Sequence, residues 1–272
     1  MSFATDAGSN NVPNEDAVAA TSQVVVVVDG VSAPKNLPTG CIHGTSWYAR
    51  SLASQIVASV SRASKVDLQL ALDEALRGVA ASHVDTCDLS CDGTPSATVA
   101  VLCENAERID YLVLSDAVIA IEDSSSVGVI ADKRVEQLLG SLIDATKAVP
   151  VGSPEHEERL IKLVSEQRKL RNVQGGYWLA GAIPEAAEHA IVGSVAAENI
   201  HCAAVMTDGA ASLVDLYQAM SWKDALKEFA SEHPYKWIER VREIEIADSD
   251  AVRWPRYKTS DDATLALCTF SR

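Results

Sequence analysis

Five consecutive valines at positions 24–28 constrain the fold of this chain more than any other stretch. A run of β-branched residues without polar alternation predicts a strand that is buried on both faces. The run stops at Asp29 and Gly30. A carboxylate at that point is costly to desolvate unless a positive charge answers it, and a glycine lets the backbone turn sharply and a ligand approach closely. The sequence therefore predicts a central strand with a chemically active acid at its end.

The same construction recurs twice. An apolar run ends at Asp208-Gly209, and Asp261-Asp262 opens another apolar run. If these three strands are neighbours in one sheet, their acids gather at one end of it, together with Glu15 and Asp16. Two like charges about 4 Å apart repel by roughly 4 kcal/mol at an effective dielectric of about 20. Either the pKa values of the acids rise or hard divalent cations bind between them, and we favour the cations.

Composition excludes some partners. The chain has 272 residues, with 23 basic against 38 acidic ones and a formal net charge of −15, so we expect no nucleic-acid partner. The N-terminus lacks the features of a signal peptide, and no stretch approaches the roughly 20 apolar residues of a membrane span. We therefore expect a cytoplasmic protein without a membrane partner.

The six cysteines are scattered, and Cys103, Cys202 and Cys268 lie in apolar strand-like runs, which predicts small buried side chains in a reducing compartment. His83, Cys87 and Cys91 follow one another at intervals of four residues, a spacing that would align them for a soft metal on a continuous helix. No fourth ligand is evident in the sequence, so we favour a structural role for the three residues.

Hydrophobic periodicity and turn residues outline the elements. We expect strands at 17–20, 24–28, 96–103, 109–114, 118–122, 126–130, a turn into a strand at 175–179, and strands at 200–207 and 263–270. We expect helices at 45–64, 68–84, within 132–172, and at 210–220, 222–231 and 234–247. The four strands between 96 and 130 suggest an antiparallel meander, and the element order favours an α+β fold. Without a linker, a single domain over 1–272 is expected, with a helical insertion at roughly 132–172.

Six short motifs occur in a characteristic order. They are Asn14-Glu15-Asp16, Val28-Asp29-Gly30, Pro95-Ser96-Ala97-Thr98-Val99, Leu114-Ser115-Asp116, Thr207-Asp208-Gly209 and Asp261-Asp262-Ala263-Thr264. In this order the chain resembles the metal-dependent type-2C (PPM) serine/threonine protein phosphatases, and within them the divergent actinobacterial members. The resemblance implies a bacterial protein with a four-layer α-β-β-α sandwich of two mainly antiparallel sheets flanked by helices.

The resemblance also implies a dinuclear Mn²⁺ or Mg²⁺ centre at one end of the sandwich, with a third, weaker site. By this resemblance, Asp29 would bridge both ions. Glu15 and the carbonyl of Gly30 would bind one ion, and Asp208 and Asp261 would bind the other. Asp116 would belong to the third site. Asp29 and Asp208 are then the catalytic acids. Two such cations would activate a water molecule and neutralise charge on the phosphoryl oxygens, so no protein nucleophile is required.

The chain departs from the family pattern near the substrate. Asn11 stands where the best-known members carry a phosphate-gripping arginine, and Val31-Ser32-Ala33 replaces their His-Gly-Gly. A basic cluster of Arg253, Arg256 and Lys258 is a candidate replacement, since a guanidinium binds phosphate through two parallel hydrogen bonds. A solvated charge cluster is the alternative. Val31 also excludes haloacid-dehalogenase-type chemistry, which needs a second acid two residues after the first.

We therefore expect a phosphomonoester hydrolase that acts on phosphoserine or phosphothreonine in proteins. Two alternatives stay open. One is a non-catalytic pseudophosphatase that binds a partner or ligand through the same cleft, and the other is a phosphatase for a small phosphorylated metabolite. The four principal acids favour a metal enzyme, while Asn11 favours the pseudophosphatase.

Overall fold

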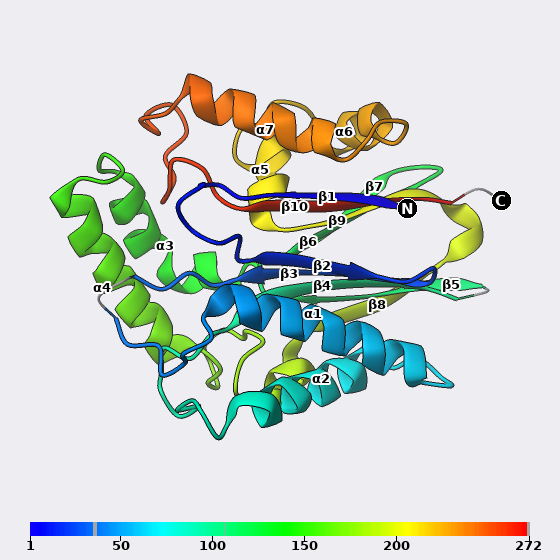
Figure 1. The fold of residues 1–272 in the computed structure, drawn as a ribbon. Helices are drawn as coiled ribbons and strands as arrows, with labels where there is room; N and C mark the ends of the chain where they lie inside the picture. Colours follow the sequence, from blue (N-terminus) through cyan, green and yellow to red (C-terminus); the bar gives the residue numbers. More distant parts are fainter. Residues whose placement is uncertain (35–36, 106, 271–272) are drawn as a thin grey trace.

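The computed structural model describes residues 1–34, 37–105 and 107–270. Two five-stranded antiparallel sheets stack face to face, and helices cover both outer faces (Figure 1). This is the expected α+β, four-layer α-β-β-α sandwich. A shared apolar layer between the sheets and one layer under each set of helices make up the core.

The first sheet has the valine strand near its centre. Its order is β2 (Asp16–Ala20), β3 (Val24–Gly30), β4 (Ala97–Glu104), β5 (Arg108–Leu114) and β8 (Ile191–Ala196). Its outer face is covered by α1 (Thr45–Arg62) and α2 (Leu68–His83). Val24, Val26 and Val28 pack under these helices, while Val25 and Val27 pack against the other sheet. The prediction of a strand buried on both faces is confirmed.

The second sheet carries the C-terminal strand. Its order is β1 (Ser2–Asp6), β10 (Ala263–Thr269), β9 (Ile200–Met206), β6 (Val118–Asp123) and β7 (Val127–Ile130). Three helices cover it, namely α5 (Asp208–Asp215), α6 (Trp222–Phe229) and α7 (Tyr235–Ala247). Trp237 is fully buried in this layer and donates its indole N–H to the carbonyl of Ala210 at 2.9 Å.

Three expectations about strands are wrong. The meander is interrupted, because β4 and β5 pair in one sheet while β6 and β7 pair in the other. The chain changes sheets at Ser115, whose φ of 64° makes the sharp turn that a meander would not need. No strand forms at 175–179, where Tyr177 makes a single bridge to Arg171. The three acid-bearing strands are also not neighbours in one sheet, since β3 lies in the first sheet and β9 and β10 lie in the second.

Helices α3 (Arg134–Lys147) and α4 (Pro154–Leu170) lie side by side beyond one end of the sandwich (Figure 1). They share a small apolar cluster of Leu139, Ile143 and Leu163, against which Tyr257 packs. Two short 3₁₀ helices, η1 (Pro184–His189) and η2 (Ala197–Asn199), flank β8. Within the described parts of the chain, none of the helices has the length and apolar character that crossing a bilayer requires.

Candidate metal centre

Acids from both sheets converge at the end of the sandwich that faces α3 and α4. Asp29 lies at the end of β3, Asp116 follows β5, Asp208 begins α5 directly after β9, and Asp261 precedes β10. The antiparallel pairing places these strand ends on the same side of the molecule. The predicted gathering of acids therefore occurs, but it is built across two stacked sheets.

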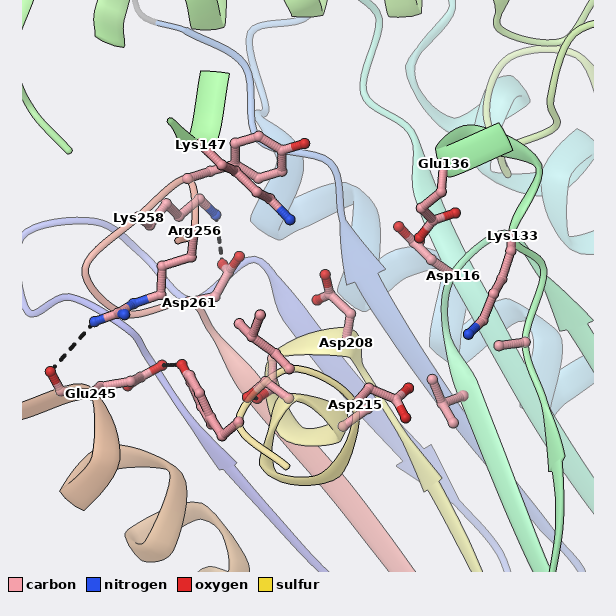
Figure 2. A pocket seen from close by; sticks show the side chains of 18 of the residues that line it. Asp116, Lys133, Glu136, Lys147, Asp208, Asp215, Glu245, Arg256, Lys258 and Asp261 are labelled. Carbon is pink, nitrogen blue, oxygen red and sulfur yellow. Dashed lines mark hydrogen bonds and ion pairs between the residues drawn. The ribbon is translucent and has the colours of Figure 1, made fainter. Parts of the chain in front are cut away.

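Two adjoining cavities of about 310 and 280 Å³ meet at these acids. Both are lined by Asp116, Asp208, Tyr257, Lys258 and Asp261, and Figure 2 shows the three aspartates pointing into the same space. Asp29 and Gly30 line the smaller cavity. Among the described residues, no three of these carboxylates place oxygens within 4.8 Å of one another. They are spread along a cavity wall and do not close into a single small cage.

Asp29 is flanked in the sheet by two polar side chains, each of which has a buried oxygen without a partner in the part of the chain that the structure describes. Asp16 lies opposite it on β2 and Thr98 lies opposite it on β4. One oxygen of Asp16 accepts a hydrogen bond from the hydroxyl of Thr207 at 2.9 Å. The other oxygen of Asp16 and the hydroxyl of Thr98 are buried and have no partner among the described residues. Buried polar atoms normally find partners, so these two mark a place suited to an ion or to ordered water.

The electrostatics of the site oppose full ionisation. Desolvation raises the pKa of Asp29 well above its usual value, and the charges of Asp16, Asp208, Asp261 and Asp116 raise it further. Desolvation, together with Asp208 and Glu136, raises the pKa of Asp116 to about 7. The pKa of Glu15 is raised as well, again chiefly by desolvation. A cation bound in this cavity would relieve the same repulsion that raises these pKa values.

Glu15 is held beside Gly30 by a backbone network. The backbone N–H of Glu15 donates to the carboxylate of Asp262 at 2.6 Å, and the N–H of Gly30 donates to the carbonyl of Glu15 at 3.1 Å. A Cβ atom at Gly30 would lie 2.7 Å from that carbonyl oxygen and 2.4 Å from a methyl group of Thr45. The glycine is therefore required by the close approach of the two segments. Ser32 donates its hydroxyl to the Glu15 carboxylate.

The basic cluster divides into three different environments. The ammonium of Lys258 lies 2.6 Å from the carboxylate of Asp261 and 3.1 Å from the hydroxyl of Ser32. Arg256 is buried and bound to Asp248 at 2.8 Å, and Figure 2 shows it turned toward Glu245 and away from the acids. The remaining residue, Arg253, lies over the ring of Trp254 at 4.2 Å. Lys258 is thus the member of the predicted cluster that the structure brings to the acids, whereas Arg256 serves the packing of its own loop.

Three site residues were not found from the sequence. Ser32 links Glu15 to Lys258, Thr207 supports Asp16, and Tyr257 lines both cavities. The first two adjoin predicted acids, three residues after Asp29 and one residue before Asp208. Their closeness in sequence to the predicted acids could therefore have identified them as site residues, although no function was predicted for their hydroxyl groups.

The donors fit a hard divalent cation. Five carboxylates and one backbone carbonyl are available, and Mg²⁺ and Mn²⁺ prefer such oxygen ligands. The predicted ligands that line the smaller cavity are Asp29, Gly30, Asp116, Asp208 and Asp261. Glu15 is hydrogen-bonded to Ser32, which lines the same cavity. Asp116 lies beside Glu136, on the side of the cavity toward α3 (Figure 2).

The chain matches a known protein family over most of its length. The family model of protein phosphatase 2C matches residues 5–241. The chain belongs to the protein phosphatase 2C family. The match includes all the predicted ligands except Asp261, which lies beyond its end. A search of curated protein sequences returned no match.

Solved structures of the family share the fold at low sequence identity. The serine/threonine phosphatase Stp1 from Staphylococcus aureus superposes with a TM-score of 0.60 at 11% identity, over 99% of this chain and 94% of its own. The serine/threonine phosphatase PstP/Ppp from Mycobacterium tuberculosis gives 0.56 at 14% identity, over 99% and 97%. The catalytic domain of PstP in complex with two manganese ions gives 0.53 at 14% identity, over 97% and 95%. These neighbours establish that the two-sheet architecture is the family's own.

Proposed function

We propose that this chain is a metal-dependent phosphomonoester hydrolase that acts on phosphoserine or phosphothreonine in proteins. The observation that carries the proposal is the convergence of Asp29, Asp208 and Asp261, from strands of both sheets, on one cavity wall. Membership of the protein phosphatase 2C family supports it. None of the six cysteines, all of which the structure describes, forms a disulfide, which agrees with our further proposal of a bacterial cytoplasm as the compartment.

In this proposal the acids hold two Mn²⁺ or Mg²⁺ ions and the rest of the wall serves the substrate. Glu15 and the carbonyl of Gly30 would bind one ion, Asp208 and Asp261 the other, and Asp29 both, with Asp116 available for a third. Such ions, when bound, supply an activated water molecule and neutralise charge on the phosphoryl group. Support comes from the oxygen-only donor set and from the unpartnered polar atoms on both sides of Asp29.

The residue proposed to bind the phosphate is Lys258. Its ammonium already lies among the acids, at hydrogen-bond distance from Asp261 and Ser32. Binding of cations to the carboxylates would free this ammonium to contact a phosphoryl oxygen as a point charge. Arg256 is not proposed for this task, because its guanidinium donates to Asp248 and to carbonyl groups of its own loop.

One observation favours a non-catalytic alternative. Asn11 is exposed on the loop before Glu15, where the resembling phosphatases carry their phosphate-binding arginine, and its backbone N–H bonds only to the hydroxyl of Ser9 among the described contacts. A pseudophosphatase would keep the metals and bind a partner or ligand in the cavity. A third candidate, a phosphatase for a small phosphorylated metabolite, differs only in the substrate.

The test is hydrolysis of p-nitrophenyl phosphate by the full chain with added Mn²⁺. We expect metal-dependent turnover that falls at least a hundredfold in Asp29→Asn and Asp208→Asn, and that persists in Asp250→Asn, an exposed control. Calorimetric titration with Mn²⁺ separates the alternatives. Metal binding without turnover on this substrate, on phosphopeptides and on a panel of phosphorylated metabolites would establish the pseudophosphatase, and absence of metal binding would refute both proposals.

A further inference from the structure

A second cluster of metal-ligating side chains lies next to the N-terminus of α1. Cys41 and His43 come from the loop between β3 and α1, His83 is the last residue of α2, and Cys87 follows one turn later. One ligand atom from each of these four residues falls within 4.8 Å of all the others. This cluster contains no acid of the cavity described above.

We propose that Cys41, His43, His83 and Cys87 form a structural zinc site. The distances fit this ion. In a tetrahedral site with Zn–S bonds of about 2.3 Å and Zn–N bonds of about 2.0 Å, neighbouring ligand atoms lie roughly 3.3–3.8 Å apart. The Cys87 sulfur lies 3.3 Å from Nδ1 of His43 and 3.4 Å from the Cys41 sulfur. The Cys41 sulfur lies 3.7 Å from Nδ1 of His43 and 3.7 Å from Nδ1 of His83.

The local sequence explains why the four groups meet. His83 and Cys87 are four residues apart, and the backbone N–H of Cys87 bonds to the carbonyl of His83 at 3.0 Å, so both side chains leave the same face of a helical turn. The partner residues form a short Cys-x-His pair directly before the first turn of α1. The carbonyl of Gly40 accepts from the backbone N–H of Asp88 at 2.8 Å, which ties this loop to the end of α2.

The surroundings hold both histidine rings in place. Trp47, in the first turn of α1, stacks on His43 with ring centroids 4.4 Å apart and lies 5.1 Å from the ring of His83. His83 is buried, although its neighbours in the cluster are more open. A buried imidazole and two thiols converging with a packed second imidazole form a soft, four-ligand set, which is typical of closed structural zinc sites.

A disulfide is the competing explanation for the two sulfurs. The separation of 3.4 Å between Cys41 and Cys87 is far longer than the roughly 2.05 Å of a disulfide bond. A disulfide would also leave the convergence of the two imidazole nitrogens on the same point without a cause. The earlier grouping of His83 and Cys87 with Cys91 is corrected by the structure, because the Cys91 sulfur lies outside the cluster and contacts the carbonyl of Pro38 at 3.8 Å.

The site would fasten a segment that matters for the acid cavity. The α1 N-terminus begins two residues after His43, where Thr45 contacts Gly30 and the hydroxyl of Ser46 donates to the carbonyl of Asn14 at 2.6 Å. Zinc bound to the four ligands would therefore hold the start of α1, and with it the loop that carries Glu15. The zinc proposal does not depend on phosphatase activity, since its ligands are separate from the acids.

The test is the zinc content of the full chain, purified without added metal and dialysed, measured by inductively coupled plasma mass spectrometry. We expect about one zinc per chain in the wild type, in Cys91→Ser and in Asp208→Asn, and loss of at least three quarters of it in Cys41→Ser and Cys87→Ser. Cys91→Ser is the matched control because it removes a neighbouring thiol outside the cluster. Asp208→Asn shows that the zinc is not held by the acid cavity.

Cobalt substitution of the wild-type chain keeps the proposal testable if the cysteine variants fail to fold. Tetrahedral cobalt with two thiolates should give intense visible bands together with a thiolate-to-cobalt charge-transfer band. Wild-type protein that retains no zinc and gives no such bands would overturn the proposal. So would zinc that persists in Cys87→Ser, or an intact mass and thiol count showing Cys41 and Cys87 joined by a disulfide in freshly purified protein.

Discussion

Replacing Asp116 by asparagine should stabilise the metal-free protein, and the gain should depend on pH. Desolvation, Asp208 and Glu136 raise the pKa of Asp116 to about 7 in the folded state, against a usual value of 3.8. The unfolded chain therefore releases the proton at lower pH than the folded chain does. Between the two pKa values the folded state binds more protons, so stability falls as pH rises through this window and levels off above about pH 7. An asparagine carries no proton to lose, and it escapes this penalty.

The magnitude follows from the size of the shift. A difference of about 3 pKa units corresponds to about 4 kcal/mol at about 1.4 kcal/mol per unit. Asp116 faces a cavity that is open to water, and its neighbours titrate with it, so the expected gain is smaller, about 1–2 kcal/mol at pH 8. At pH 5 roughly a third of the gain should be present, because that pH lies about a third of the way through the window.

Urea unfolding of the wild type and of Asp116→Asn, both dialysed free of manganese, at pH 5 and pH 8 measures this difference. Asp250→Asn removes an exposed acid that lines neither cavity, so its stability relative to the wild type should be the same at pH 5 and pH 8. Saturating Mn²⁺ should narrow the gap between Asp116→Asn and the wild type, since bound cations neutralise the same acids. A wild type that is as stable as Asp116→Asn at pH 8 would show that charge repulsion at Asp116 costs the fold nothing.

Three further substitutions probe other parts of the site. Gly30→Ala should destabilise the fold by about 1–3 kcal/mol in urea unfolding, because the added Cβ would collide with the carbonyl oxygen of Glu15. Gly128→Ala is the control, since its Cβ would meet no atom within 4 Å, and equal effects of the two substitutions would contradict the packing argument. Arg256→Ala should cost about 3 kcal/mol of stability, because the Asp248 carboxylate loses its cationic partner and keeps only backbone N–H donors. Unchanged stability with a raised KM would instead return Arg256 to the phosphate site. Lys258→Met should raise the KM for p-nitrophenyl phosphate several-fold in steady-state assays, and an unaltered KM would remove Lys258 from substrate binding.

The acids of the cavity could be predicted because each adjoins a strand with a strong signal. The valine run places Asp29 at a buried strand end, and the apolar runs beside Asp208 and Asp261 do the same. Which strands are neighbours could not be predicted in this way. The hydrophobic pattern of a strand buried on both faces is the same in either sheet, and the turn at Ser115 that sends the chain from one sheet to the other carries no distinctive residue.

Interactions between distant segments account for the position of Arg256. In the sequence it is one of three basic residues close to Asp261, which suggested a phosphate clamp. In the structure its guanidinium is committed to Asp248, at the C-terminal end of α7, and to carbonyls of the intervening loop. Lys258, two residues later, lies on the opposite side of the same loop and reaches the acids. Proximity in sequence located the loop. Both cations line the larger cavity, and only the fold shows that Lys258 is the one that reaches Asp261.

The proposed zinc site follows the same logic. Helical periodicity aligned His83 with Cys87, yet it also pointed to Cys91, which leaves the helix and contacts another loop. The true partners, Cys41 and His43, precede α1 and are forty residues away in the chain, so no local pattern connects them with α2. Packing of α1 against α2 brings the two pairs together, and Trp47 packs against both histidine rings. The sulfur and nitrogen donors of this cluster suit zinc, whereas the oxygen donors of the acid cavity suit manganese or magnesium, so the two proposed sites of the chain differ in ligand chemistry.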